Sequence, residues 1–303
     1  MTGSGPCIAL WLLNLGHVVP SASDWLALVD MQAEDAARQG ADILLMPEHL
    51  GEHWLHFAPV DLPVTEQPQW FSSQTDSMLS GLRKIAMRHD LLLVAGSWPV
   101  HDNSATMPGA ASPLVNRCHL IFPDGSLQSQ DKLCLTPCEK DPTGWMMSPG
   151  KQLSVFRYKG FRLIVNICLD VELPALATRV SALEPDLLLV PAMTIQPSGY
   201  HRVFSCAKAR AIELGCAVAV TGLCGGITPE DSYCSGAAVY LPCQSGLNSN
   251  GVHASLPPQM GDSGPGKLLI AKDLPLQELR ELRHQSQPRL AGWSSEPITF
   301  NAE

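Results

Sequence analysis

Short, continuous apolar runs recur along the chain, each bounded by polar or turn-forming residues. The runs Ile8 to Leu15, 42–46, 91–96 and 187–190 do not alternate between apolar and polar positions as half-exposed strands do. They are also shorter than most helices. Runs of this kind predict strands that are buried on both faces of a sheet.

Between these runs lie segments with apolar residues at helical spacing, and we expect helices at 24–38, 74–89, 173–183 and 201–214. The alternation of strands and helices is followed by adjacent strands near 217–221, 235–241 and 268–274. Such an order of elements predicts a mixed α/β fold.

Several segments show neither the continuous apolar runs of buried strands nor the apolar spacing of helices. Residues 49–69 and 136–150 are broken by prolines and are expected to be loops, the first of them covering a substrate site. Residues 244–266, rich in Gly, Ser, Asn and Pro, predict a flexible surface loop, and 284–303 a tail along the surface or against a partner subunit. Because no linker or charge block divides the chain, we expect one domain over 1–303.

Composition narrows the class of protein. The 303 residues are 45% hydrophobic and 16% charged, which is enough for a large core. A net charge of −9 without a basic run argues against nucleic acid and favours a small-molecule partner. The apolar run at the N-terminus has no basic flank and is too short to span a bilayer. Ten cysteines without a disulfide-like spacing suit a reducing compartment, so we expect a cytoplasmic protein with no membrane partner.

Three reactive side chains come directly after predicted strands. Cys168 follows the apolar run 161–167, Glu48 follows 42–47, and Lys132 follows a predicted hairpin over 115–131. In an α/β fold the strand ends are the places where loops converge and reactive groups gather. A free thiol is mostly neutral at pH 7, so a nucleophilic cysteine needs a base or a cation beside it.

The order and local sequence of these residues resemble the nitrilase or carbon–nitrogen hydrolase superfamily, from about Ile8 to Arg283. The resemblance includes a helix containing Arg-Ala-x-Glu and a strand that ends in proline. The matching segments are Leu44-Leu45-Met46-Pro47-Glu48, Asp131-Lys132-Leu133-Cys134-Leu135, Ile167-Cys168-Leu169-Asp170, Ala209 to Glu213 and Ser235 to Pro242.

The resemblance implies a four-layer α-β-β-α sandwich. It also implies a homodimer or a higher homo-oligomer, joined through helices near the cysteine, here 173–183 and 201–214. It implies no cofactor and no metal. Family members attack an amide or nitrile carbon with the thiol, expel the amine and hydrolyse the thioester. By this resemblance Glu48 is the general base, and Lys132 stabilises the thiolate and the oxyanion together with the N–H after Cys168. Glu139 matches the second glutamate of the family or is a solvated loop carboxylate.

Some positions depart from the family pattern. Leu169 stands where many amidases have an aromatic residue, and Glu172 stands where several have an arginine. The negative charge of Glu172 would repel a substrate carboxylate and could instead pair with an amine. We expect the pocket to be lined by these two side chains together with Trp54, Trp145 and Met193.

Three alternatives remain open at this point. Nitrilases and N-carbamoyl amide hydrolases share the same triad and differ in pocket lining. A catalytically idle relative would bind a small molecule or a partner through the same pocket. A zinc hydrolase would use His49, His53 and His56, which would share one face if their segment were helical.

Overall fold

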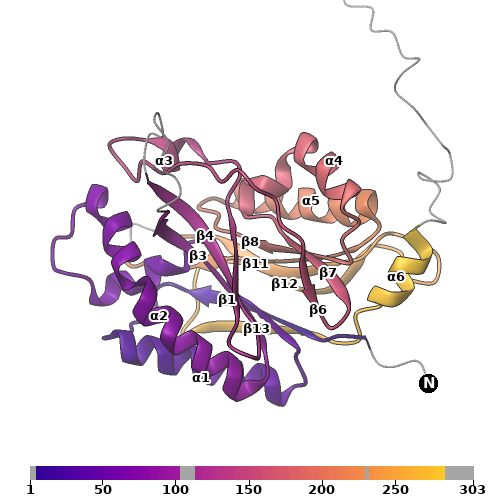
Figure 1. The fold of residues 1–303 in the computed structure, drawn as a ribbon, viewed down its shortest axis with the longest axis horizontal. Coiled ribbons are helices and arrows are strands. Elements are labelled where there is room, and N and C mark those ends of the chain that lie inside the picture. The colour runs from indigo at the N-terminus through magenta and orange to yellow at the C-terminus, as the bar shows by residue number, and fades with distance from the viewer. Residues whose placement is uncertain (1–4, 103–112, 229–231, 284–303) are drawn as a thin grey trace, which may run out of the picture.

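Two β-sheets packed between helices form the core of the protein (Figure 1). The computed structural model describes residues 5–102, 113–228 and 232–283. The expected four-layer α-β-β-α arrangement is confirmed: α1 and α2 lie outside one sheet, and α4 and α5 lie outside the other.

The first sheet has seven strands and is covered by α1 (Ala22–Arg38) and α2 (Gln67–His89). Strand β13 lies antiparallel to β1. The order of the others is β10 (Leu223–Cys224), β1 (Ile8–Asn14), β2 (Ile43–Leu45), β3 (Leu92–His101), β4 (Leu114–Ile121) and β5 (Leu127–Asp131), with β13 spanning Gly266–Ala271.

The second sheet has six strands and is covered by α4 (Pro174–Ala182) and α5 (Pro197–Leu214). Its order is β12 (Val252–Gln259), β11 (Ser235–Tyr240), β9 (Ala217–Thr221), β8 (Leu187–Pro191), β7 (Phe161–Val165) and β6 (Phe156–Tyr158). The shorter elements are α3 (Pro137–Lys140), α6 (Leu276–Leu282) and the 3₁₀ helices η1 (Leu50–Phe57), η2 (Val64–Glu66) and η4 (Cys168–Glu172). Among the described residues, no helix combines the length and the apolar character that crossing a membrane requires.

Strand β1 shows why the apolar runs are continuous. Ile8 and Leu10 point into the core between the two sheets, whereas Ala9, Trp11 and Leu13 point into the core under α1 and α2. All of these side chains are fully buried. A strand in the middle of a four-layer fold has no face in water, so its sequence does not alternate.

Prolines mark the places where the predicted boundaries were wrong. Residues 252–259 form β12, although the whole of 244–266 was expected to be loop. This strand lies at the edge of its sheet, where Pro257 and Pro258 can be accommodated. Helix α2 begins seven residues earlier than expected, because Pro68 occupies its first turn and does not interrupt it.

The C-terminal part of the described chain is anchored by buried arginine. The guanidinium of Arg283 donates to the carbonyl oxygens of Gly215 and Glu184 at 3.2 and 3.0 Å and lies 3.3 Å from the carboxylate of Asp186. Arg280 also donates to Asp186, at 3.1 Å. Helix α6 is therefore fixed to the second sheet. The expected tail over 284–303 lies outside the described residues.

The imidazole of His119 is buried and makes no hydrogen bond to any of the described residues. Both ring nitrogens lack a partner, and the ring lies against that of Trp98 with centroids 4.5 Å apart. Burial, assisted by the charge of Arg117, lowers the pKa of His119 to about 3. The imidazole is therefore held neutral in the folded protein.

We predict that His119 makes the protein sensitive to acid. Between its unfolded pKa of about 6.5 and its folded pKa, the unfolded chain binds a proton that the folded chain excludes. Above that range His119 does not change the free energy of unfolding. As the pH falls through the range this free energy decreases, by about 2 kcal/mol at pH 5. His119→Leu should remove this contribution, measured as a smaller loss of melting temperature between pH 7.5 and pH 5. The same change at the exposed His201 should leave the loss unaltered, and equal losses in all three proteins would contradict the prediction.

Candidate active site

The two sheets meet at the ends of β2, β7 and β8. The backbone N–H of Glu48, after β2, donates to the carbonyl oxygen of Ala192, after β8, at 3.3 Å. The thiol of Cys168, after β7, lies 3.4 Å from the carbonyl oxygen of Met193. These contacts place the carboxylate and the thiol at one junction, where polar groups from several strand ends converge.

A glycine bulge in β3 fixes the position of Glu48. Gly96 has φ of +62°, and a Cβ at that position would lie 2.0 Å from the carbonyl oxygen of Pro47. Only glycine permits this approach. Next to it, Ser97 accepts a hydrogen bond through Oγ from the backbone N–H of His49 at 3.2 Å. The bulge therefore holds residues 47–49 against β3.

The β4–β5 hairpin presents Lys132 and Asn116 side by side. Arg117 pairs with Asp131 across the two strands, so the next pair along the ladder is Asn116 and Lys132. The backbone N–H of Lys132 donates to the carbonyl oxygen of Asn116 at 2.9 Å. Residues directly opposite each other in antiparallel strands point to the same face, which brings both side chains into the site.

Lys132 joins two carboxylates in the interior. Its Nζ lies 2.7 Å from Oε1 of Glu48 and 2.7 Å from Oε2 of Glu139. The exposed fractions of Lys132, Glu48 and Glu139 are 1%, 1% and 4%. Burial disfavours the ammonium, but the two carboxylates outweigh this cost and raise the pKa of Lys132 well above its usual value. Lys132 is a permanent cation.

Glu139 is saturated with hydrogen-bond donors. Thr136 caps α3 and donates to Oε2 through both its backbone N–H, at 2.8 Å, and its hydroxyl, at 2.9 Å. Oε1 accepts from Asn116 at 2.9 Å, and His49 Nε2 lies 3.3 Å away. Burial opposes ionisation, but His49 and Lys132 hold the pKa of Glu139 well below its usual range. The carboxylate is therefore a fixed anion and a poor base.

Cys168 occupies a strained position. Its φ of +46° lies in the left-handed region, which is unusual for a residue with a side chain. The thiol is buried, and burial together with the charge of Glu48 raises its pKa well above its usual value, although Lys132 acts in the opposite direction. At rest Cys168 is therefore a neutral thiol that needs a base.

Asp170 ties the turn of Cys168 to the segment of Lys132. Its carboxylate accepts from the backbone N–H groups of Ile167 at 3.1 Å, Leu133 at 3.3 Å and Cys134 at 2.8 Å. Burial raises the pKa of Asp170 to about 6 despite these donors. One buried side chain thus fixes two segments that come from different sheets.

The structure brings together part of the expected pocket lining. Leu169 and Met193 flank Cys168 and are partly exposed, and Trp145 packs edge-on against His49 with ring centroids 4.8 Å apart. Glu172 lies on η4 and accepts a hydrogen bond from Arg202 of α5. Its charge is therefore already compensated within the chain.

Trp54 was expected to line the pocket and does not. Its side chain is fully buried, and its ring neighbours are Trp25, Phe71 and Trp98 in the core under α1 and α2. The reason is local: residues 50–57 form the 3₁₀ helix η1 rather than an open loop. That helix turns the indole toward the outer helices.

The three histidines considered for zinc do not converge. His53 and His56 direct Nε2 to the carbonyl oxygens of His17 and Leu15, at 2.6 and 2.7 Å. Burial lowers the pKa of His53 to about 4. Among the described residues, the group with metal-ligand geometry is Glu48, His49 and Glu139. There Lys132 already bridges both carboxylates, so a metal ion would meet a like charge.

Sequence reasoning missed Asn116 and the site roles of His49 and Asp170. Asn116 lies inside a strand, where one amide carries no signal of its own. The orientation of Glu139, by contrast, can be predicted from the sequence. The sequence Thr136-Pro137-Cys138-Glu139 is a capping box, and the structure shows both of its hydrogen bonds.

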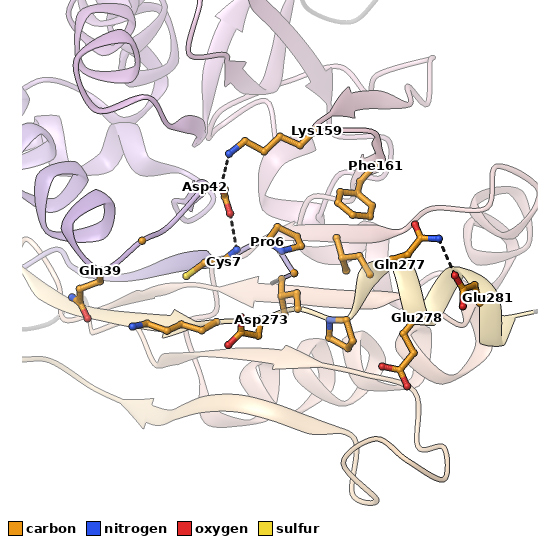
Figure 2. A pocket seen from close by; sticks show the side chains of 16 residues that line it. Pro6, Cys7, Gln39, Asp42, Lys159, Phe161, Asp273, Gln277, Glu278 and Glu281 are labelled. Carbon is orange, nitrogen blue, oxygen red and sulfur yellow. Dashed lines mark hydrogen bonds and ion pairs between the residues drawn. The ribbon is translucent and has the colours of Figure 1, made fainter. Parts of the chain in front are cut away.

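A sizeable surface cavity lies away from these residues. Figure 2 shows a surface cavity of about 1150 Å³ lined by Pro6 and Cys7 before β1, by Lys159 of the β6–β7 turn, and by Gln277 and Glu281 of α6. None of the residues that line it belongs to the cluster around Lys132. Its size therefore does not make it the catalytic site.

Comparison with known proteins supports a hydrolase. The family model described as carbon-nitrogen hydrolase matches residues 12–252. An amidase from Nesterenkonia sp. is 26% identical, with a TM-score of 0.65 over 94% of this chain and 97% of that one. A mutant of that amidase has been solved in complex with butyramide.

Two further relatives show the breadth of the likeness. Nit3 of Saccharomyces cerevisiae, a member of branch 10 of the nitrilase superfamily, shares the fold with a TM-score of 0.70 at 18% identity, over 94% of this chain and 96% of that one. The probable hydrolase YhcX of Bacillus subtilis (strain 168) is 23% identical over 265 residues, or 86% of this chain. This chain spans only 48% of the length of YhcX.

We predict that Asp170→Asn lowers the free energy of unfolding by weakening the contacts around Cys168 and Lys132. The amide keeps one acceptor oxygen but sets its NH₂ against backbone N–H donors, which should cost about 1–3 kcal/mol of unfolding free energy. Chemical denaturation measures this loss. Asp124→Asn is the matched control, because Asp124 also accepts a backbone N–H, from Ser126, but in an exposed turn. A midpoint for Asp170→Asn equal to that of the parent would show that Asp170 does not hold the two segments together.

Proposed function

As the chain belongs to the carbon–nitrogen hydrolase family, we propose that it hydrolyses a small amide to a carboxylic acid and ammonia or an amine. One observation carries the proposal. A buried cluster holds a base, a permanent cation and a fixed anion beside a thiol. Burying these charges costs folding free energy, and clusters of this kind are concentrated at functional sites.

In the first half-reaction Cys168 attacks the carbonyl carbon. The C–S bond forms while the thiol proton passes to Glu48, and the carbonyl electron pair becomes an oxyanion. Lys132 and the backbone N–H of Leu169 stabilise that oxyanion. The C–N bond then breaks, the leaving nitrogen takes the proton from Glu48, and a thioester remains on Cys168.

In the second half-reaction water cleaves the thioester. Glu48 takes a proton from the water as its oxygen adds to the carbonyl carbon, and the C–S bond breaks when the intermediate collapses. The proton on Glu48 returns to the sulfur, which restores the thiol. Within the described residues both side-chain hydrogen bonds to Glu48 go to Oε1, from Lys132 at 2.7 Å and Asn116 at 3.1 Å. Oε2 is therefore the oxygen that handles the proton.

Two observations favour an amide over a nitrile or an N-carbamoyl compound. The residue two positions after the thiol is Asp170, as is more typical of amidases than of nitrilases. A mutant of the Nesterenkonia amidase, at 25% identity, has been solved in complex with butyramide. Leu169 and Met193 offer apolar surface beside the thiol, and Trp145 packs on His49. Such a lining suits a short acyl chain.

We further propose that the protein is a homodimer joined through α4 and α5. A groove between these helices is lined by small side chains and by the ion pair of Arg210 and Glu213, and Ile212 of α5 is 44% exposed. The small lining residues are Ala177, Thr178, Ser181 and Ala209. Small side chains and an exposed apolar residue suit helix-to-helix contact.

Light scattering should give twice the chain mass, and Ile212→Glu should shift the protein toward the monomer. A monomeric parent at micromolar concentration would contradict this.

The test of the activity is ammonia release from a panel of short aliphatic amides, nitriles and N-carbamoyl compounds. We expect turnover of amides by the parent and a loss of at least about a thousandfold in Cys168→Ala. Glu48→Gln should lose a similar factor, because the amide cannot accept the thiol proton. Mass spectrometry should show the acyl adduct on Cys168 of the parent during turnover.

The outcomes separate the alternatives. Turnover of nitriles or N-carbamoyl compounds alone would replace the amide assignment with one of those activities. If no compound is turned over and no acyl adduct forms on Cys168, the idle binding relative is the better description.

A further inference from the structure

His49 is a fourth ionisable side chain in the cluster, next to the base along the chain. It is 5% exposed, and its Nε2 lies 3.3 Å from Oε1 of Glu139 and 3.7 Å from Oε1 of Glu48. Its backbone is in the left-handed region with φ of 50°, which directs the ring inward. Trp145 packs edge-on against the ring. His49 is thus held in place from several sides.

The hydrogen-bond pattern determines which ring nitrogen carries the proton. Asn116 Nδ2 has two hydrogens, and its acceptors at 3.1 and 2.9 Å are Oε1 of Glu48 and Oε1 of Glu139. Neither hydrogen is left for His49 Nε2 at 3.3 Å. Nε2 must therefore carry its own hydrogen and donate it to Glu139. Nδ1 has no partner among the described residues.

Without a positive charge on His49, the negative charges beside its ring outnumber the positive ones. Glu48 from the end of β2 and Glu139 from α3 are negative, Lys132 from the end of β5 is positive, and Cys168 from η4 is a thiol. The remaining neighbours, Asn116 of β4, Ser97 of β3 and Trp145, are neutral. An imidazolium at His49 matches the two carboxylates beside it with two cations. The buried carboxylate of Asp170, which also feels the charge of Lys132, is held by three backbone N–H groups on the side of Cys168. Burial opposes that charge, but the two carboxylates outweigh it and raise the pKa of His49.

We propose that His49 is a positioning residue for the reaction: its Nε2–H fixes Glu139, and its positive charge balances the second carboxylate while negative charge moves onto sulfur and then onto the oxyanion. This inference rests on the proposed amide hydrolysis. When the thiol proton passes to Glu48, the anions are the substrate oxyanion and Glu139, and the cations are Lys132 and His49. Loss of the imidazolium proton leaves one negative charge unbalanced and slows the reaction at high pH.

Three variants separate charge, donor and ring. His49→Gln keeps an N–H donor but cannot be charged, and His49→Phe keeps a ring against Trp145 with neither property. His56→Gln is the control, because His56 lies on the adjacent 3₁₀ helix and bonds the carbonyl oxygen of Leu15 at 2.7 Å outside the cluster. Melting temperatures establish that each variant is folded.

The first measurement needs no substrate. The rate at which iodoacetamide modifies Cys168 at pH 7, followed by peptide mass spectrometry, reports how readily the thiolate forms. We expect the rate to fall about tenfold in H49Q, further in H49F, and less than twofold in H56Q. An H49Q rate equal to that of the parent overturns the proposal.

The second measurement is the pH profile of kcat on an amide that the parent hydrolyses. The parent should lose activity on the alkaline side, whereas H49Q should have a lower plateau without that decline and a KM within about threefold of the parent. An H49Q enzyme that keeps the alkaline decline, or that is folded but inactive, overturns the proposal. If the parent hydrolyses no amide, the proposed function fails, and the alkylation rates still decide the role of His49.

Should H49Q fail to fold, the imidazole ¹⁵N resonances of the parent give the answer directly. We expect His49 to carry protons on both nitrogens at pH 7, with Nε2–H hydrogen-bonded. A neutral ring at that pH overturns the proposal.

Discussion

The ammonium of Lys132 sits where almost no water reaches it, and the rest of the site is arranged to make that possible. An isolated buried charge costs several kcal/mol, and this cost is offset only by close partners that are themselves hydrogen-bonded. Glu48 and Glu139 provide the opposite charge at 2.7 Å each. Each carboxylate in turn needs donors, which come from Asn116 and Thr136. The segment after β2, strand β4 and the segment from β5 to α3 must therefore be in place before any of these charges is stable.

The same constraint gives the two glutamates different roles. Both lie the same distance from Lys132, yet Glu139 accepts donors at both oxygens while the donors to Glu48 converge on Oε1. A carboxylate that accepts so many hydrogen bonds keeps its charge and gives up its basicity. In the proposed mechanism the distribution of donors, rather than distance, makes Glu48 the base. That distribution depends on the capping box of α3 and on the β4–β5 register.

Much of this could be predicted from the sequence, because buried strands are visible as apolar runs and a reactive residue after such a run lies at a strand end. Glu48, Lys132 and Cys168 were singled out in that way. The order of elements predicted a mixed α/β fold, and the family resemblance implied its four layers. What could not be predicted depends on contacts distant in sequence. Trp54 was misplaced because nothing local shows that its segment coils into η1. Asn116 acts through hydrogen bonds to Glu48 and Glu139, which reach it from the segments that follow β2 and β5 of the first sheet. Asp170 acts through hydrogen bonds that join segments from the two sheets. Strand β12 was missed because its prolines are compatible with a strand only at a sheet edge.

A nucleophile kept neutral at rest has a chemical consequence beyond the reaction itself. Oxidation of cysteine proceeds through the thiolate and depends on access by the oxidant. Burial and the charge of Glu48 both hold the proton on Cys168, whereas Cys138 and Cys243 lie exposed on the surface. In the proposed mechanism the thiolate of Cys168 forms only as the proton moves to Glu48 during attack, with Lys132 beside it. In that mechanism the thiol becomes reactive when a carbonyl carbon is in place, and its burial limits the access of oxidants at other times.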